Sequence, residues 1–264
     1  MVLLSLTAIA SPYELSDTGR TNRPGQPAAL VVFTPGLTAS AYEPLLDALE
    51  SAGLDTWTLR FPPAAQDADR ITGQWIPEAA VEAAGGRPIA VIGYGLGGTL
   101  AALSIDAGAL TPDALVLLGS PLRCEPLGLY DWLAQQSLPS SDLDLIGAQE
   151  ARWQEMPVLE LLIGTPLPQL EALSPGWLAT LQSWAGGALS VDLRDDSVAV
   201  WAGASGLDNL APPEWVRPAV PATSFFRFGY LRFESEDPDH IGLLSNPRAL
   251  RMLSRWTATT LRER

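Results

Sequence analysis

The sequence has no lysine, one cysteine (Cys124) and one histidine (His240) in 264 residues. A single cysteine cannot form an intramolecular disulfide. One cysteine and one histidine also fall short of the three or four ligands of a typical zinc site. We therefore expect no bound metal, and nothing in the sequence calls for a cofactor.

Long apolar runs are also missing, and charged residues make up only 17% of the chain. A membrane-spanning helix needs about 18 or more consecutive apolar residues, so we expect no transmembrane segment. All 16 basic residues are arginines, and 30 acids leave a formal charge of -14. An acidic surface repels phosphate backbones and anionic lipids, which argues against nucleic acid and anionic membranes as partners.

Residues 1–10 contain Ala8-Ile9-Ala10, which resembles a signal-peptidase site. The positively charged start of an export signal is absent and the apolar run is short. We expect this segment to be an edge strand of a cytoplasmic protein, with an exported form left open.

Short apolar runs alternate with helix-like segments through the first half of the chain. Strands are expected at 29–33, 55–60, 88–93 and 113–119, and helices at 40–52, 71–84 and 97–106. Ser40 is the expected cap of the first helix. Repeated strand–helix units of this length predict an α/β fold with a mostly parallel central sheet flanked by helices.

The pattern changes between residues 120 and 193, where no convincing strand occurs. We expect this stretch to be a helical cap inserted into a core formed by 1–119 and 194–264. Its tryptophans, which either pack the cap or line an apolar pocket beneath it, are Trp132, Trp153, Trp177 and Trp184. Two more strands are expected at 197–202 and 224–228. A final helix follows Asn246, a natural cap, and Pro247, which suits the first helical position.

The most informative motif is Gly93-Tyr94-Gly95-Leu96-Gly97, which follows the third expected strand. It has the layout of the G-x-S-x-G nucleophile elbow, in which a serine stands on a sharp turn between a strand and a helix. Here Gly95 takes the place of the serine. A dinucleotide-binding turn is the alternative, but it belongs after a first strand and has a different glycine spacing.

These motifs resemble those of the α/β-hydrolase superfamily, which includes esterases and lipases, and the resemblance covers nearly the whole chain. It implies a triad order of nucleophile, acid and histidine. The matching positions are Gly95, Asp208 in Gly206-Leu207-Asp208-Asn209, and His240 in Asp237-Pro238-Asp239-His240. The family's His-Gly pair is replaced by Pro35-Gly36, and the amides of Leu37 and Leu96 are the expected oxyanion-hole donors.

Without the serine, acyl-enzyme chemistry is lost, because removing this nucleophile costs on the order of 10⁶ in turnover. The resemblance thus favours a catalytically inactive relative, a pseudoenzyme, that binds a small apolar ligand or a protein partner. One alternative is an enzyme that uses Asp208 and His240 as a general-base dyad. Another is a hydrolase whose nucleophile was mutated or lies elsewhere. No other residue of the elbow can replace the serine, since Thr99 lies one turn into the helix, but Ser120 and Cys124 follow a neighbouring strand and are candidates to approach the site.

Overall fold

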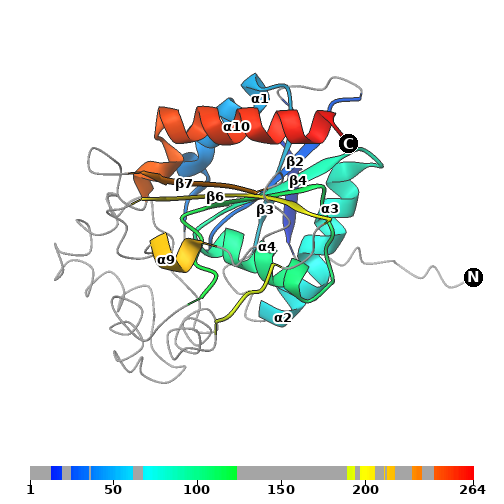
Figure 1. Ribbon diagram of the computed structural model, residues 1–264. Coiled ribbons are helices and arrows are strands. Elements are labelled where there is room, and N and C mark those ends of the chain that lie inside the picture. Colours follow the sequence, from blue (N-terminus) through cyan, green and yellow to red (C-terminus); the bar gives the residue numbers. More distant parts are fainter. Residues whose placement is uncertain are drawn as a thin grey trace, which may run out of the picture.

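The computed structural model describes residues 13–19, 25–35, 37–61, 68–123, 189–193, 197–205, 211, 213–217, 228–233 and 241–264. Its centre is a seven-stranded sheet with the order β1-β3-β2-β4-β5-β6-β7 (Figure 1). The strands are β1 (Glu14–Asp17), β2 (Ala28–Val32), β3 (Asp55–Arg60), β4 (Ile89–Tyr94), β5 (Ala114–Leu118), β6 (Ala199–Ser205) and β7 (Phe228–Phe233). Only β1 is antiparallel to its neighbour, so the predicted mostly parallel sheet is confirmed.

The four central strands are buried along their full length. β2, β4, β5 and β6 contain no exposed residue. A parallel sheet is covered by helices on both faces, so its strands are apolar runs rather than alternating patterns. This is why these strands can be recognised in the sequence within one to three residues of their ends.

Two layers of helices cover the sheet (Figure 1). α1 (Glu43–Ser51) and α10 (Pro247–Arg262) pack on one face, with Leu45 and Leu253 among their buried side chains. α3 (Ile76–Ala84) and α4 (Leu96–Asp106) pack on the other. The short helices are η1 (Ala39–Tyr42), α2 (Ala68–Arg70), η2 (Ile71–Trp75), α9 (Pro213–Val216) and η6 (Ile241–Leu244).

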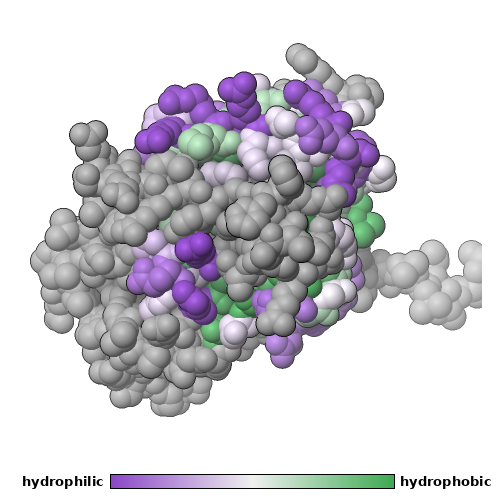
Figure 2. All heavy atoms as spheres, viewed as in Figure 1, coloured by the Kyte–Doolittle hydropathy of each residue, from purple (hydrophilic) through white to green (hydrophobic). Residues whose placement is uncertain are grey.

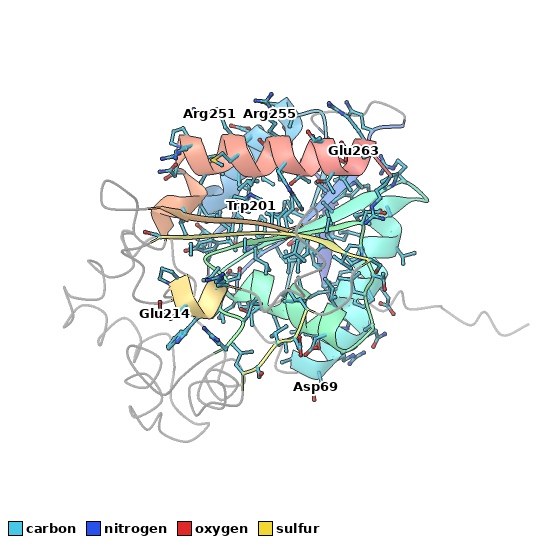
Figure 3. The ribbon with its side chains drawn as sticks, in the orientation of Figure 1. Asp69, Trp201, Glu214, Arg251, Arg255 and Glu263 are labelled. Carbon is cyan, nitrogen blue, oxygen red and sulfur yellow. The ribbon has the colours of Figure 1, made fainter. Side chains whose placement is uncertain are left out.

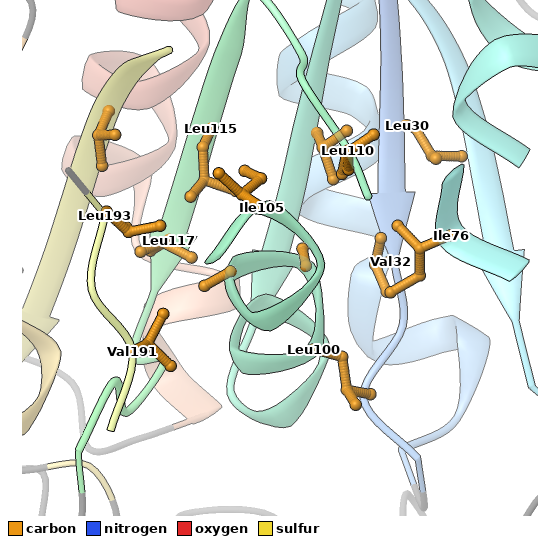
Figure 4. Close-up of a cluster of buried hydrophobic side chains, with 14 of the residues drawn as sticks. Leu30, Val32, Ile76, Leu100, Ile105, Leu110, Leu115, Leu117, Val191 and Leu193 are labelled. Carbon is orange, nitrogen blue, oxygen red and sulfur yellow. The ribbon is translucent and has the colours of Figure 1, made fainter. Parts of the chain in front are cut away.

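Each helical layer forms its own apolar core against the sheet. The core under α3 and α4 joins side chains from the strands, the helices and the segment 189–193 (Figure 4). Val191 and Leu193 enter this core, and the Val191 amide donates to the Leu122 carbonyl at 2.8 Å. The described ends of the 120–193 stretch, where the helical cap is expected, are therefore extended chain packed on the core. The rest of that stretch, 124–188, lies outside the described residues.

The end of the fold follows the sequence signals closely. The Asn246 side chain accepts hydrogen bonds from the amides of Arg248 and Ala249, both at 2.9 Å, and Pro247 begins α10. Among the helices that the structure describes, none is long and apolar enough to cross a bilayer.

Two helix predictions need correction. Ser40 does not cap α1; it lies within η1, and the α-helix begins three residues later at Glu43. The helix expected over 71–84 begins at Ala68 and is interrupted by the π-helical turn η2. Pro77 has no N–H and its ring clashes with the carbonyl four residues earlier in an α-helix, so a wider turn before α3 removes the conflict.

Two strands of the sheet, β7 and β1, were predicted only in part or not at all. β7 is described over Phe228–Phe233 and so extends beyond the end of the strand expected at 224–228, because Gly229 and Arg232 interrupt the apolar run that would have marked it. Residues 224–227 lie outside the described residues. β1 was not predicted, since Glu14–Asp17 is a polar edge strand with no buried residue to reveal it. The edge strand expected in residues 1–10 lies outside the described residues.

Candidate functional site

The glycine-rich motif forms a sharp turn between β4 and α4. Gly95 is the single residue between them and has φ 52° and ψ −129°. Its amide donates to the Leu118 carbonyl of the neighbouring strand β5 at 2.9 Å. A positive φ is costly for a residue with a side chain and free for glycine. The backbone thus has the strand–turn–helix form that a nucleophile elbow requires, with no side chain at its apex.

The glycines around Gly95 are required by close packing rather than by φ. A Cβ on Gly93 would lie 2.2 Å from the Gly98 Cα, and one on Gly97 would lie 2.3 Å from the Val32 carbonyl oxygen. A Cβ on Gly98 would lie 2.1 Å from the Ser120 Oγ. Helix α4 therefore sits against β2, β4 and the end of β5 at a distance that only glycine allows.

Thr34, just after β2, holds the turn in place. Its hydroxyl donates to the Tyr94 carbonyl and accepts a hydrogen bond from the Gly97 amide at 3.2 Å. The Thr34 amide in turn donates to the Tyr42 hydroxyl at 2.7 Å. Burial raises the pKa of the Tyr42 phenol well above its ordinary value, and the hydrogen bonds to Thr34 offset only part of that rise. This network is not evident from the sequence, where its only signal is a polar residue directly after a buried strand.

The other hydroxyls described near the turn are hydrogen-bonded to backbone carbonyls. Ser120 is fully buried, and its hydroxyl donates to the carbonyls of Gly93 and Leu118 at 3.3 and 3.2 Å. Thr99 is also fully buried and donates to the Pro121 carbonyl at 2.7 Å. Ser120 thus ties the end of β5 to β4, and Thr99 ties α4 to the chain that follows β5. Cys124, the other candidate nucleophile, lies outside the described residues.

The two expected oxyanion-hole donors differ in their surroundings. The Leu37 amide donates to the Thr34 carbonyl at 3.2 Å and so closes the turn through Pro35. Leu96 is the first residue of α4, where backbone amides have no partner within the helix. An anion above Gly95 would thus meet the backbone amides at the start of α4. The Leu37 amide would have to give up its hydrogen bond to Thr34 before it could donate one to the anion.

Asp208 and His240 lie outside the described residues, and their contact with Gly95 stays a prediction. Their places in the chain are nevertheless informative. Asp208 falls in the connection after β6, and His240 falls in the connection between β7 and η6. β4, β6 and β7 run parallel, so the connections that follow them leave the same edge of the sheet. That edge is where open α/β sheets bind ligands.

Comparison with solved structures assigns the fold. A lipase–esterase related protein from Clostridium acetobutylicum superposes with a TM-score of 0.63 at 15% identity, covering 96% of this chain and 99% of that one. The enol-lactonase from Burkholderia xenovorans gives 0.59 at 14% identity and covers 95% of both chains. MenH from S. aureus gives 0.59 at 13% identity, covering 96% of this chain and 98% of that chain.

The chain has the α/β-hydrolase fold. No family model and no curated protein sequence matches it. At these identities the similarity covers the backbone and the order of its elements, and it does not extend to the activity of these proteins.

No group of three or more acidic, histidine or cysteine side chains in the described parts of the chain is arranged to hold a metal ion. At the described edge of the sheet, α4 presents the backbone amides of its first turn, and Gly95 before it contributes no side chain.

Proposed function

We propose that this protein is a catalytically inactive member of the α/β-hydrolase-fold group, with a binding or assembly role. The observation that carries the proposal is Gly95 at the apex of the turn between β4 and α4. In a serine hydrolase the residue here attacks the substrate carbonyl, and a glycine has no atom to do so. The nearby hydroxyls of Ser120 and Thr99 support the same reading, since both are buried and donate to backbone carbonyls.

Turnover of a short activated ester such as p-nitrophenyl acetate tests the proposal directly. Wild-type protein should hydrolyse the ester no faster than protein-free buffer, and a fluorophosphonate should label none of its serines. Gly95→Ser restores the hydroxyl at a turn that already has the elbow's backbone angles, so we expect this variant to be labelled at residue 95. Gly95→Ala is the matched control, because it adds the same Cβ without the oxygen.

Wild-type turnover above background, or labelling of another serine in the wild-type chain, would contradict the proposal. It would point instead to a hydrolase whose nucleophile lies elsewhere in the chain. A Gly95→Ser variant that is folded but unlabelled would mean that Asp208 and His240 do not activate a hydroxyl at this position.

For the binding role, we propose a small apolar ligand held between the sheet edge and the 120–193 segment, whose four tryptophans supply apolar surface. A fluorescent fatty-acid analogue is a suitable probe. Saturable binding that Gly95→Leu weakens would place the ligand above the turn. Absence of binding would leave a role in contacting another protein.

A second candidate is an enzyme that uses Asp208 and His240 as a general-base dyad. It is favoured by the sole histidine of the chain falling after β7, beside the strand that Asp208 follows. Such an enzyme would lose its activity in His240→Ala and keep it in Gly95→Ala. A serine hydrolase also depends on its histidine, but it loses its activity when the residue at the nucleophile position is removed.

A further inference from the structure

The outer face of α10 is basic, although the chain as a whole is strongly acidic. Arg248, Arg251 and Arg255 are exposed and follow one another at spacings of three and four residues, which place them on one side of a helix. Figure 3 shows Arg251 and Arg255 on the side of α10 turned away from the sheet, and in Figure 2 hydrophilic side chains gather over this helix. The helix has no acidic residue, and in the part of the chain that the structure describes these three arginines have no ion pair.

The outer face of α3 has the opposite charge. Glu78 and Glu82 are exposed, one helical turn apart, and neither has a cationic partner within the described structure. The neutral side-chain amide of Gln74 donates a hydrogen bond to the Glu78 carboxylate at 3.0 Å. Together with burial, the charges of Glu78 and Glu82 raise the pKa of Tyr13. This face therefore presents two uncompensated negative charges to the solvent.

On each of these charged faces, an exposed apolar side chain lies between two of the charged residues. Val81 is 75% exposed and Met252 is 39% exposed, and they are the two large hydrophobic residues found exposed in the described structure. Val81 lies beside Glu82 and three residues after Glu78. Met252 lies beside Arg251 and three residues before Arg255. The spacing of the charged and apolar residues along α10 is therefore the reverse of the spacing along α3, and the charges have the opposite sign.

If α10 lies antiparallel on α3, all three positions match in one register. Opposite charges then meet on both sides of an apolar contact: Arg251 with Glu82, Met252 with Val81, and Arg255 with Glu78. In the same register Arg248 lies opposite Gly85, which ends α3. A cation is favourable there, because the carbonyl end of a helix carries a partial negative charge.

This contact cannot form within one molecule, because α3 and α10 cover opposite faces of the sheet. We propose that the protein self-associates head to tail, with α10 of one copy docked antiparallel on α3 of the next. A second copy is the occupant that carries the matching charges, apolar contact and spacing on its own described surface. Such a contact is heterologous, so it builds a closed ring or an open chain rather than a two-fold dimer. It goes beyond the proposed function and does not depend on Gly95.

Sedimentation velocity over a range of protein concentrations tests this proposal. The average sedimentation coefficient should rise with concentration at low salt and fall back toward the monomer value at about 1 M salt, where charges are screened beyond about 3 Å. Arg251→Glu/Arg255→Glu and Glu78→Arg/Glu82→Arg should each weaken association at least roughly tenfold, because like charges then face each other.

Charge swapping separates this contact from a general effect of net charge. The fourfold variant that combines both pairs has the wild-type net charge and should associate as the wild type does. A one-to-one mixture of the two double variants should also associate, since each then meets its complement on the other. All four sites are exposed, and circular dichroism checks that each variant is folded.

Three results would overturn the proposal. Wild-type protein that stays monomeric at every concentration at low salt would do so. A fourfold variant that fails to associate while folded would do so as well. Loss of association on reversing the arginines but not the glutamates would show that α10 contacts some other acidic surface.

Discussion

The hydroxyl of Thr34 donates a hydrogen bond to the carbonyl of Tyr94, the residue immediately before the glycine at the apex of the turn. Sixty positions separate the two residues in the sequence. Thr34 therefore fixes the geometry of the candidate site from a neighbouring strand, and it does so with both its donor and its acceptor, since the Gly97 amide donates to the same oxygen.

Replacing Thr34 by valine should lower the free energy of unfolding by about 1–3 kcal/mol, because the Tyr94 carbonyl and the Gly97 amide both lose a partner in a partly buried site. Thr38→Val is the matched control. The Thr38 hydroxyl pairs with the Ser40 hydroxyl at 2.9 Å at an exposed position. Its loss should cost within about 0.5 kcal/mol. Urea unfolding of the three proteins measures the difference, and equal effects would mean that Thr34 does not hold the turn.

Close packing of α4 on the sheet predicts that Gly98→Ala is destabilising by about 1–3 kcal/mol, as overpacking usually is. The new Cβ would lie 2.1 Å from the Ser120 Oγ and 2.9 Å from the Gly93 carbonyl oxygen. The same substitution at Gly73, where a Cβ meets nothing within 4 Å, should be neutral or stabilise by up to about 1 kcal/mol. Thermal unfolding of both variants checks the contrast; a stable Gly98→Ala protein would refute the packing argument.

Much of this fold is predictable because its central strands are buried on both faces and so form apolar runs. The turn at Gly95 and the cap at Asn246 are also local features, since each depends on residues within a few positions of it. Thr34 could not be assigned its role from sequence, because its partners at Tyr94 and Tyr42 lie on other elements. The edge strand β1 was missed for a similar reason: its register depends on pairing with β3 and not on its own composition.

The backbone of Gly95 predicts a cost for any side chain at this position. With φ at 52°, alanine and serine are both strained, and each should lower the free energy of unfolding by about 1–3 kcal/mol relative to the wild type. The two losses should be similar, because both variants add a Cβ at the same backbone angles. Chemical denaturation measures them, and an unchanged stability in both would mean that the turn relaxes away from the elbow geometry.

The absence of lysine makes the alkaline stability of this protein depend on its tyrosines. Burial raises the pKa of Tyr42, whereas in the unfolded chain a tyrosine ionises near about 10. Above that pH the unfolded chain releases a proton that the folded protein keeps. The stability contributed by Tyr42 is thus fully present below about pH 10 and is lost above it, by up to about 1.4 kcal/mol per pH unit.

Tyr42→Phe should remove this slope while lowering stability at neutral pH, since the Thr34 amide then loses its acceptor. The free energy of unfolding, measured from about pH 9 to 11.5, shows the effect without interference from lysine, which would titrate near 10.4. Tyr13→Phe is a useful comparison, because the pKa of Tyr13 is also raised, by partial burial and then by Glu78 and Glu82. Its phenol is half-buried, so its slope should be smaller. A Tyr42→Phe variant with the wild-type slope would show that Tyr42 ionises as readily in the folded protein as in the unfolded chain.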